Sequence, residues 1–445
     1  MVLKAFIYSK LAQRTGSKTP PVRCANILTY SSLSATATLS FFFVYLPPVN
    51  NSRHITVFVP PRRPGQRSVM GLVAAPMDMV RIGIVGLGIR GMQALRRLGH
   101  IPGARVSALC DVNPASLETA RKDVPEAWAC TDWKELCARA DVDLVYICTD
   151  WKHHVPVAME AMDHGKHVAI EVPAAGTLED IWALVDKAEQ TRLHCMMLEN
   201  SVYDHFERVA LEMARAGVFG TIVHAEGAYL HKLDFDKEVW RREYNRSRRG
   251  DIYPTHGIGP VCQALGIHRT DRLQTLVSVD TGAFTGQDIT GDSSFANADQ
   301  TNTLIRTEKA KTILIEHNVM TPRPYSRMYQ LVGTQGYASK YPVPQICLLQ
   351  DGEEIIYEGE RLKALMAPYD IAGLPAELLP AVQEVDAKHE GMDLLMDYRL
   401  VQALREGRPL DMDVYDLAEW CALAPLSALS LDNGGAPVAF PQFIR

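Results

Sequence analysis

The segment Val80–Gly91, VRIGIVGLGIRG, decides the fold. Residues 80–85 are mainly apolar and β-branched, as in a buried parallel strand. A G-x-G-x-x-G motif follows at once, and residues 92–98 have the apolar spacing of a helix. The three glycines of the motif permit a tight turn, close approach of a pyrophosphate and close helix–strand packing. Strand, loop and helix in this order predict a dinucleotide-binding Rossmann unit.

A carboxylate follows the next predicted strand. Residues 106–110 form that strand, and Asp111 comes directly after it, about 20 residues beyond the glycine motif. An acidic side chain at this place accepts hydrogen bonds from the ribose hydroxyls of adenosine and repels a 2′-phosphate. No basic residue follows Asp111 directly. The pattern therefore favours NAD over NADP as the cofactor.

Further strand–helix units continue to about residue 200. Strands are predicted at 142–148, 167–170 and 193–198, with helices at 155–164 and 178–190. Ligands in open α/β sheets bind beyond the carboxyl ends of the strands. Several polar and aromatic residues follow those ends, and we expect them at the rim where a nicotinamide lies. They are Trp151, Lys152, His153, His154, Glu171, Glu199 and Asn200.

The alternation of strands and helices stops after residue 200. Segments 221–229, 275–279, 300–306 and 311–317 have the pattern of sheet strands. We therefore expect an open, mostly antiparallel sheet, one face covered by helices and the other facing the cofactor. The predicted fold class is α/β, with an N-terminal Rossmann domain and a C-terminal α+β domain. The predicted divisions are an extension at 1–77, the Rossmann domain at 78–200 and the substrate domain at 201–445.

Composition excludes several classes of protein. Hydrophobic residues make up 47% and charged residues 22% of the 445, as in globular rather than disordered or coiled-coil chains. The net charge of −6 gives no general attraction to nucleic acid or anionic lipid, so small molecules or glycans are the expected partners. The nine cysteines include no C-x-x-C pair, and His153 and His154 are adjacent, so no metal site is expected.

Residues 1–77 do not have the pattern of a domain. Their apolar run at 36–46 has eleven residues, whereas a membrane-spanning helix needs about 20. The run also lies too far from the start for an ordinary signal peptide, so we expect no stable membrane insertion and, by default, a cytoplasmic protein. We interpret 1–77 as a weakly ordered extension or as translation from an upstream start. A targeting role is the alternative.

Tyr253 and His256 stand three residues apart in the second half. If a helix begins near Pro254, both side chains lie on its N-terminal face. A phenol and an imidazole beside a nicotinamide could take up the proton of a carbinol that is being oxidised. The arginine-rich segment 240–250 nearby is interpreted as a solvated loop, because the acidic chain around it argues against a nucleic-acid patch.

These motifs resemble those of a known family. Residues from 80 to about 190 resemble the Gfo/Idh/MocA group of nicotinamide-dependent sugar oxidoreductases. From 80 to 445 the chain looks like glycoside hydrolase family 109, the NAD-dependent α-N-acetylgalactosaminidases. The matching stretches are GLGIRG (86–91), WKHH (151–154), EVPAA (171–175), MMLEN (196–200), YLH (229–231), GDIYPTHG (250–257), RPY (323–325) and HEGMD (389–393).

One departure from the wider oxidoreductase group is informative. Those enzymes usually have Glu-Lys-Pro after the fifth strand, with the lysine close to the reacting carbinol. This chain has Glu171-Val172-Pro173 instead. Without that lysine the acid and the base must come from elsewhere, which favours the hydrolase branch.

The resemblance implies hydrolysis without net redox change. NAD+ oxidises the sugar at C3, the new ketone acidifies the C2 proton, a base removes that proton, and the group at C1 leaves by elimination. Water then adds, and the ketone is reduced again. This route needs no pair of catalytic carboxylates.

The resemblance also implies roles for individual residues. Tyr229 is the base at C2, supported by His231 and Glu199, while Tyr253 and His256 handle the C3 hydroxyl proton. The expected substrate contacts are Tyr229, Arg241, Tyr253, Pro254, Thr255, His256 and Tyr325. The expected cofactor contacts, from the glycine motif and the resemblance, are Gly86, Gly88, Ile89, Arg90, Gly91, Asp111, Trp151, Lys152, His153, His154, Glu171, Val172 and Asn200.

Two alternatives stay open. An NAD-dependent sugar dehydrogenase would accumulate NADH in proportion to the substrate consumed, and a non-catalytic NAD-binding regulator would turn over nothing. The sugar and its anomer depend on few residues around Arg241 and Tyr325. Because exposed sheet faces of this fold commonly pair, a homodimer is a candidate assembly.

Overall fold

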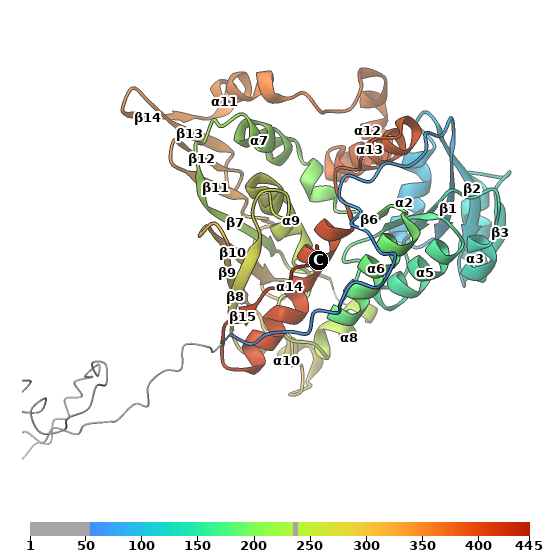
Figure 1. The fold of residues 1–445 in the computed structure, drawn as a ribbon, viewed down its shortest axis with the longest axis horizontal. Coiled ribbons are helices and arrows are strands. Elements are labelled where there is room, and N and C mark those ends of the chain that lie inside the picture. Colours follow the sequence, from blue (N-terminus) through green and yellow to red (C-terminus); the bar gives the residue numbers. More distant parts are fainter. Residues whose placement is uncertain (1–53, 235–238) are drawn as a thin grey trace, which may run out of the picture. The chain divides into compact units, whose positions relative to one another are not determined.

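The computed structural model describes residues 54–234 and 239–445, which form two β-sheets with helices packed around them (Figure 1). The first sheet has six parallel strands in the order β3-β2-β1-β4-β5-β6. This is the strand order of a Rossmann fold, and the predicted architecture of the N-terminal part is confirmed. The strands are β1 (Val80–Val85), β2 (Ala104–Cys110), β3 (Trp128–Cys130), β4 (Leu144–Ile147), β5 (His167–Ile170) and β6 (Cys195–Met197).

Helices connect these parallel strands. They are α2 (Ile89–Leu98), α3 (Pro114–Arg121), α4 (Trp133–Cys137), α5 (Trp151–Asp163) and α6 (Leu178–Thr191). Side chains of Asn113, Asp132 and Thr177 accept backbone N–H groups at the starts of α3, α4 and α6. Residues 151–154, expected in a loop, form the first turn of α5 instead. The prediction missed this turn because the apolar periodicity of the helix begins only at Val155.

The second sheet has nine strands in the order β14-β13-β12-β11-β7-β10-β9-β8-β15. All its neighbouring strands are antiparallel except β7 and β10, so the predicted open, mostly antiparallel sheet is confirmed. The strands are β7 (Ile222–Leu230), β8 (Leu273–Asp280), β9 (Thr301–Thr307), β10 (Thr312–Asn318), β11 (Gln330–Gly333), β12 (Gly336–Ser339), β13 (Gln345–Gln350), β14 (Glu353–Tyr357) and β15 (Val438–Ala439).

One face of this sheet both carries helices and faces the site. Helix α9 (Thr255–Leu265) lies so close to β7 that a Cβ at Gly227 would meet the carbonyl oxygen of Gly257 at 2.1 Å. Tyr229, two residues further along β7, points to the same face. The expectation of helices on one face and cofactor on the other is therefore wrong. The opposite face is the exposed one, where Leu304 is 51% exposed.

The remaining helices lie around this second sheet, between the two sheets and, in the case of α12 and α13, against α2 of the Rossmann part (Figure 1). They are α7 (His205–Arg215), α8 (Val239–Arg246), α10 (Phe284–Thr290), α11 (Gly359–Met366), α12 (Leu379–Val385), α13 (Met392–Glu406), α14 (Val414–Asp432) and the 3₁₀ turns η1 (Asn200–Tyr203), η2 (Ala367–Tyr369), η3 (Ala376–Leu378) and η4 (Ala387–His389). Across residues 54–234 and 239–445, no helix combines the length and the apolar character needed to cross a membrane.

Most of the arginine-rich segment 240–250 is helical, which corrects the predicted solvated loop. Helix α8 covers its first part, and Arg246 donates to Glu243 at 2.7 Å on the same helix face. Arginine and glutamate are good helix formers, and pairs three residues apart stabilise a helix. Charged composition alone therefore did not identify a loop here.

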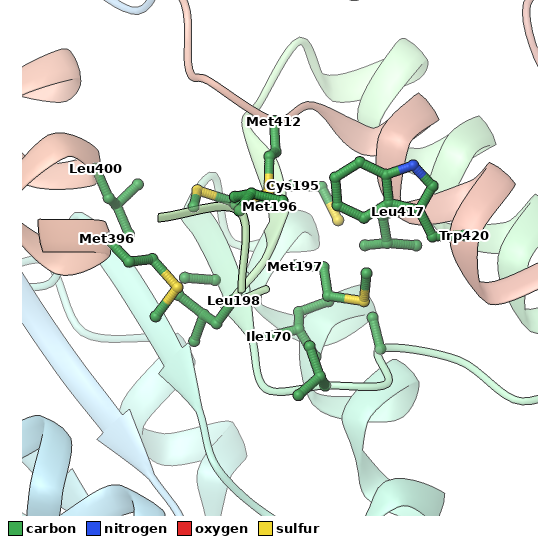
Figure 2. Packing of buried hydrophobic residues seen from close by; sticks show 14 of the residues in the cluster. Ile170, Cys195, Met196, Met197, Leu198, Met396, Leu400, Met412, Leu417 and Trp420 are labelled. Carbon is green, nitrogen blue, oxygen red and sulfur yellow. The ribbon is translucent and has the colours of Figure 1, made fainter. Parts of the chain in front are cut away.

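The C-terminal helices complete the core of the Rossmann domain. Figure 2 shows α13 and α14 packed at the edge of the Rossmann sheet, around its edge strand β6. Several sulfur-containing side chains take part in this contact, and Met197 Sδ lies 3.5 Å from Cys421 Sγ. Flexible methionines fill irregular gaps between elements that meet at different angles. The labelled residues are Ile170, Cys195, Met196, Met197, Leu198, Met396, Leu400, Met412, Leu417 and Trp420.

Residues 54–77 pack onto the folded chain, which corrects part of the predicted weakly ordered extension. Ile55 forms a β-bridge with Val438. Arg62 makes a bidentate pair with Glu189 of α6, with N–O distances of 3.1 and 2.8 Å. Val69 is buried in the core. The rest of that prediction, including the apolar run at 36–46, concerns residues 1–53, which lie outside the described residues.

Candidate active site

The glycine loop between β1 and α2 is shaped for a phosphate group. Gly86 has φ of +92°, and a Cβ there would meet the carbonyl carbon of Cys148 at 2.6 Å. A Cβ at Gly91 would lie 1.9 Å from the carbonyl oxygen of Gly86, whereas one at Gly88 would have nothing within 4 Å. Helix α2 starts after Gly88 without a side-chain cap from any described residue, so its first N–H groups are available to a ligand. The loop fits the pyrophosphate of a dinucleotide.

Asp111 is fixed at the edge of this loop. One carboxylate oxygen accepts the backbone N–H of Leu87 at 2.6 Å, and the other accepts that of Asn113 at 2.7 Å. The carboxylate thereby links the glycine loop to the end of β2. This is the place where an acidic side chain meets the ribose of an adenosine, as the sequence predicts for NAD.

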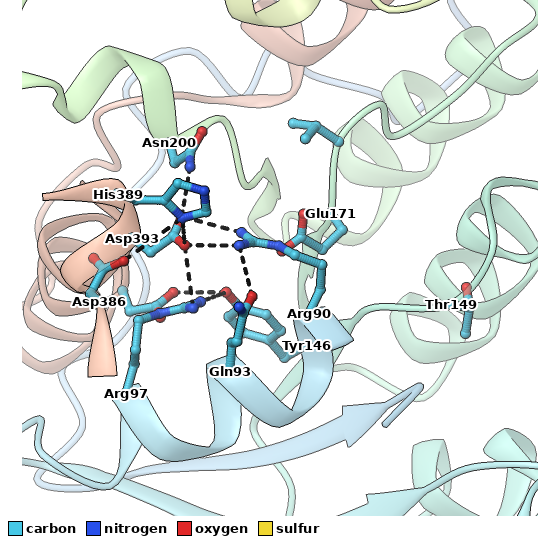
Figure 3. Close-up of polar contacts among 12 residues, drawn as sticks. Arg90, Gln93, Arg97, Tyr146, Thr149, Glu171, Asn200, Asp386, His389 and Asp393 are labelled. Carbon is cyan, nitrogen blue, oxygen red and sulfur yellow. Dashed lines mark hydrogen bonds and ion pairs between the residues drawn. The ribbon is translucent and has the colours of Figure 1, made fainter. Parts of the chain in front are cut away.

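Arg90 connects the glycine loop to the C-terminal half (Figure 3). Its guanidinium donates to Glu171 at 2.9 Å and to Asp393 at 2.9 and 3.2 Å. Asp393 also accepts from Asn200 and from His389, both at 2.8 Å. Burial alone would raise the pKa of Asp393, but the arginines beside it hold that pKa well below its usual value. Three predicted cofactor contacts, on three separate segments, therefore meet in one network.

The first turn of α5 holds the other predicted cofactor contacts. Trp151 donates its indole N–H to the carbonyl oxygen of Val172 at 3.2 Å. Lys152 and His153 both pair with Asp150. His154 is fully buried, and its ring nitrogens lie 3.0 and 3.1 Å from backbone carbonyl oxygens. The His154 side chain thus fastens α5 to the segment after β5, and its predicted cofactor contact stays a prediction.

Glu199, His256 and Tyr253 form a hydrogen-bonded chain. Glu199 Oε1 lies 2.5 Å from His256 Nδ1, and His256 Nε2 lies 3.4 Å from the Tyr253 hydroxyl. Ser201 also donates its N–H and its O–H to the same carboxylate oxygen. Burial raises the pKa of Tyr253 well above its usual value. Residues that are distant in sequence therefore meet in a hydrogen-bonded chain suited to relay a proton.

Tyr229 lies at the centre of this cluster. Its ring centroid is 4.6 Å from that of Tyr253, 4.7 Å from that of His231 and 5.1 Å from that of His256. Tyr229 lies near the end of β7, within the strand predicted at 221–229. Burial, followed by the positive charges near it, lowers the pKa of His231 to about 4, so its imidazole is neutral near pH 7.

The predicted substrate contacts surround Tyr229. The Arg241 guanidinium, on α8, lies 5.5 Å from the Trp151 ring centroid and 5.9 Å from that of Tyr253. The Tyr325 ring lies 5.4 Å from that of His231. Pro254 precedes α9 and Thr255 begins it, and both are buried. Their predicted contacts with substrate stay predictions.

Two residues of the site were not predicted. His317 is buried on β10, where it is the register partner of Tyr229. Both residues line a small cavity together with Trp151, Arg241 and Tyr253. Arg327 donates to the Tyr325 hydroxyl at 2.9 Å and is itself held by Asp204 at 2.8 Å. A histidine at the end of a predicted strand was a signal for the first. No local signal distinguished Arg327.

Within the described residues, two groups of side chains are spaced closely enough to bind a metal ion. The first is Asp386, His389 and Asp393, and the second is His268, Asp413 and Asp416. Both are engaged in ion pairs. Asp393 of the first group faces Arg90 and Arg97, and Asp416 of the second accepts from Arg269 at 2.8 and 2.9 Å. Guanidinium groups repel cations, so these carboxylates fit ion-pair roles.

Comparisons with known proteins agree with this arrangement. The family model described as "Oxidoreductase family, NAD-binding Rossmann fold" matches residues 80–199, and that described as "Glycosyl hydrolase 109, C-terminal domain" matches 203–445. The N-terminal part is therefore an NAD-binding Rossmann domain. A solved structure of levoglucosan dehydrogenase with NADH and L-sorbose shares the fold, with a TM-score of 0.66 and 17% identity over 82% of this chain and 100% of that one.

Curated relatives are much more similar in sequence. The glycosyl hydrolase family 109 protein 1 of Bacteroides fragilis (strain YCH46) is 52% identical over 419 residues, which cover 87% of this chain and 90% of the relative. The family 109 protein of Porphyromonas gingivalis is 51% identical over 429 residues, covering 89% and 91%. The chain described above belongs to glycosyl hydrolase family 109.

Proposed function

We propose that this glycoside hydrolase releases terminal α-linked N-acetylgalactosamine from glycosides, by transient oxidation of the sugar at C3. The observation that carries the proposal is the cluster of Tyr229, Tyr253, His256 and Glu199 at the rim of the NAD-binding sheet. The cluster contains proton donors and acceptors but no lysine after β5, where Val172 stands. Acid–base chemistry at a carbinol and at its neighbouring carbon needs such groups.

The glycine loop, Asp111 and the network around Arg90 are the residues that would hold NAD. Bound NAD would supply the reversible two-electron oxidation at C3 of the sugar. Asp111 would face the ribose, and the first N–H groups of α2 would face the pyrophosphate. Trp151, in the first turn of α5, stacks on Tyr253 of the acid–base cluster, with the ring centroids 5.7 Å apart.

His256 is suited to receive the proton of the C3 hydroxyl. The carboxylate of Glu199 favours the tautomer that carries its proton on Nδ1, because that N–H can donate to it. Nε2 is then the basic nitrogen, and it faces the Tyr253 hydroxyl at 3.4 Å. The raised pKa of Tyr253 keeps its phenol protonated, so the phenol can relay the proton between sugar and imidazole.

Tyr229 is suited to act at C2. A ketone at C3 makes the C2 proton acidic, and a phenolate is a strong base because the pKa of an ordinary phenol is about 10. The His231 ring lies beside Tyr229, with the ring centroids 4.7 Å apart, and its lowered pKa keeps it neutral near pH 7. Loss of the C2 proton expels the C1 substituent, and water adds to the resulting double bond.

Glu199 is unsuited to the role of a glycosidase nucleophile. It is fully buried, and donors from Ser201 and His256 occupy one of its oxygens. A carboxylate that attacks an anomeric carbon must reach the sugar. Its place behind His256 fits an orienting role, which again favours the route through C3.

A chromogenic α-N-acetylgalactosaminide tests the proposal. The purified protein is incubated with this glycoside while aglycone release and nicotinamide absorbance are followed together. Many turnovers of release without net NADH are expected. NADH accumulation without release would show a sugar dehydrogenase, and the absence of both signals with this and related glycosides would favour a regulator.

The homodimer stays a prediction, which size-exclusion chromatography with light scattering tests.

A further inference from the structure

His317 occupies a place in the sheet that directs it into the active site. In the parallel pair of β7 and β10 its register partner is Tyr229, and in the antiparallel pair of β10 and β9 its partner is Thr301. Register partners point to the same face of a sheet. Tyr229, His317 and Thr301 therefore form a row across three strands, on the face that carries the acid–base cluster.

The polar side-chain atoms of His317 and Thr301 are buried without a hydrogen-bond partner among the described residues. His317 is 1% exposed, and neither of its ring nitrogens has a hydrogen-bond partner among residues 54–234 and 239–445. Thr301 is fully buried, and its hydroxyl also lacks a partner in that part of the chain. Buried polar groups are nearly always hydrogen-bonded in native proteins, so such a pair indicates a ligand or water that supplies the bonds.

The cavity beside His317 belongs to the proposed substrate site. Trp151, Tyr229, Arg241 and Tyr253 line it together with His317. The remaining lining residues are Leu233, Ile252, Val319 and the polar Asn245. A small enclosure of this kind has room for one polar substituent of a sugar rather than for a whole ring.

The protonation state of His317 selects the kind of substituent. Burial, and then the neighbouring His231, lower the pKa of His317 to about 3, so the ring is neutral near pH 7. A neutral imidazole offers one N–H donor and one acceptor nitrogen. A sugar hydroxyl both donates and accepts, so it can pair with either ring nitrogen of His317. It can also pair with the Thr301 hydroxyl.

We infer that His317, assisted by Thr301, binds a non-reacting hydroxyl group of the sugar, at C4 or C6, and thereby contributes to sugar specificity. This inference rests on the proposed function, because it assumes a pyranose whose C3 hydroxyl faces His256. His317 is then a substrate-binding residue outside the proton relay. Removing it should weaken sugar binding more than it slows the bound sugar's reaction.

The test compares sugar binding by the NADH form of the enzyme, in which the sugar cannot be oxidised. Nicotinamide fluorescence is titrated with N-acetylgalactosamine and with its 4-deoxy and 6-deoxy derivatives. The variants are His317→Ala, His317→Asn and the nearly isosteric Thr301→Val. His224→Ala is the matched control, because His224 lies on the opposite face of β7 and has Thr312 as a partner at 2.8 Å.

The wild type should bind one deoxy sugar about 10- to 100-fold more weakly than the parent, which is the usual effect of leaving a buried hydrogen-bonding group unpaired. His317→Ala should bind the parent sugar as weakly as that deoxy sugar and lose the discrimination. Thr301→Val should lose part of it, and His224→Ala none. His317→Asn, which keeps a donor and an acceptor, should retain more affinity than His317→Ala.

Unchanged discrimination in both His317 variants would overturn the inference, as would failure of the wild type to bind any of the sugars. Thermal unfolding of each NADH-loaded variant shows that it is folded. Aglycone release is measured separately on the wild type and on the His317 variants. Sugar binding that depends on His317, without aglycone release, would refute the proposed hydrolase and support the role of His317. Aglycone release that is the same in the wild type and the His317 variants would support the hydrolase and refute that role.

Discussion

His256 Nδ1 lies 2.5 Å from Glu199 Oε1, although the two residues come from different domains of the fold. Glu199 follows β6 of the Rossmann sheet, and His256 lies in the first turn of α9, beside the second sheet. Burial alone would raise the pKa of Glu199, but the His256 ring and the other donors lower it below its usual value. The carboxylate therefore stays ionised and fixes the orientation of the imidazole.

Replacing Glu199 by glutamine should lower kcat for an α-N-acetylgalactosaminide about 100-fold, the usual scale of a disturbed acid–base group. The neutral amide no longer favours a proton on Nδ1, so Nε2 ceases to be the basic nitrogen. Glu226→Gln is the matched control, since Glu226 lies on the opposite face of β7 beside His224 at 3.3 Å. Equal kcat values in the two variants would remove Glu199 from the relay.

Replacing Tyr229 by phenylalanine should abolish exchange of the C2 proton and spare NAD binding. The phenol oxygen is the proposed base, whereas the ring that packs on Tyr253 at 4.6 Å is retained. Exchange is followed by proton NMR of the sugar in D₂O, and NAD binding by fluorescence of its reduced form. Tyr337→Phe controls for loss of a hydroxyl, because its phenol donates to Gln330 within the second sheet. Retained exchange in Tyr229→Phe would assign the base elsewhere.

Alanine at Gly88 and at Gly91 should separate cofactor binding from folding. Gly88 has a φ of −69°, and a Cβ there has nothing within 4 Å, so Gly88→Ala should fold normally. Its methyl group would occupy the space of the pyrophosphate, and NAD affinity should fall at least about tenfold, a loss on the scale of one hydrogen bond. Affinity equal to that of the wild type would place the pyrophosphate elsewhere.

Gly91→Ala should destabilise the fold itself. Its Cβ would lie 1.9 Å from the carbonyl oxygen of Gly86, so the backbone of the loop must move. Overpacking of this kind costs about 1–3 kcal/mol. Urea unfolding of the cofactor-free protein measures this difference. A Gly91→Ala protein as stable as Gly88→Ala would show that the loop adapts without strain.

The Rossmann half could be predicted because its signals are local. The strand, the glycine motif and Asp111 stand in order within one segment of the chain, and each has a direct physical reason. The motifs of the resemblance likewise led to Tyr229, Tyr253 and His256, which the fold brings together. Their chemical roles stay predictions.

The features that were missed depend on contacts between distant residues. His317 became a site residue only through its register with Tyr229. Residues 54–77 have no periodicity of their own and are held by partners such as Glu189, 127 positions away from Arg62. The faces of the second sheet were misassigned because strand alternation shows that two faces differ, but not which helices cover each one.

His268 forms a buried charge cluster at the start of α14, away from the proposed site. Its Nδ1 lies 3.0 Å from Glu419 Oε2, and its Nε2 lies 3.7 Å from Asp413 Oδ1. Burial lowers the pKa of His268, but the hydrogen bonds and charges of these carboxylates outweigh it and raise that pKa to about 10. The imidazolium is thus part of the native structure at neutral pH.

The contribution of His268 to stability should therefore disappear at high pH. Its pKa is about 10 in the folded state and about 6.5 in the unfolded state. A raised folded-state pKa stabilises fully below the unfolded value, and the effect is lost as pH rises through the folded value. His268→Gln should reduce the free energy of unfolding by on the order of 3 kcal/mol at pH 6, and by much less at pH 10. Urea titrations across this pH range measure the difference. His205→Gln is the control, because His205 pairs with Asp370 at the protein surface. A loss that is the same at both pH values would mean that His268 contributes packing rather than charge.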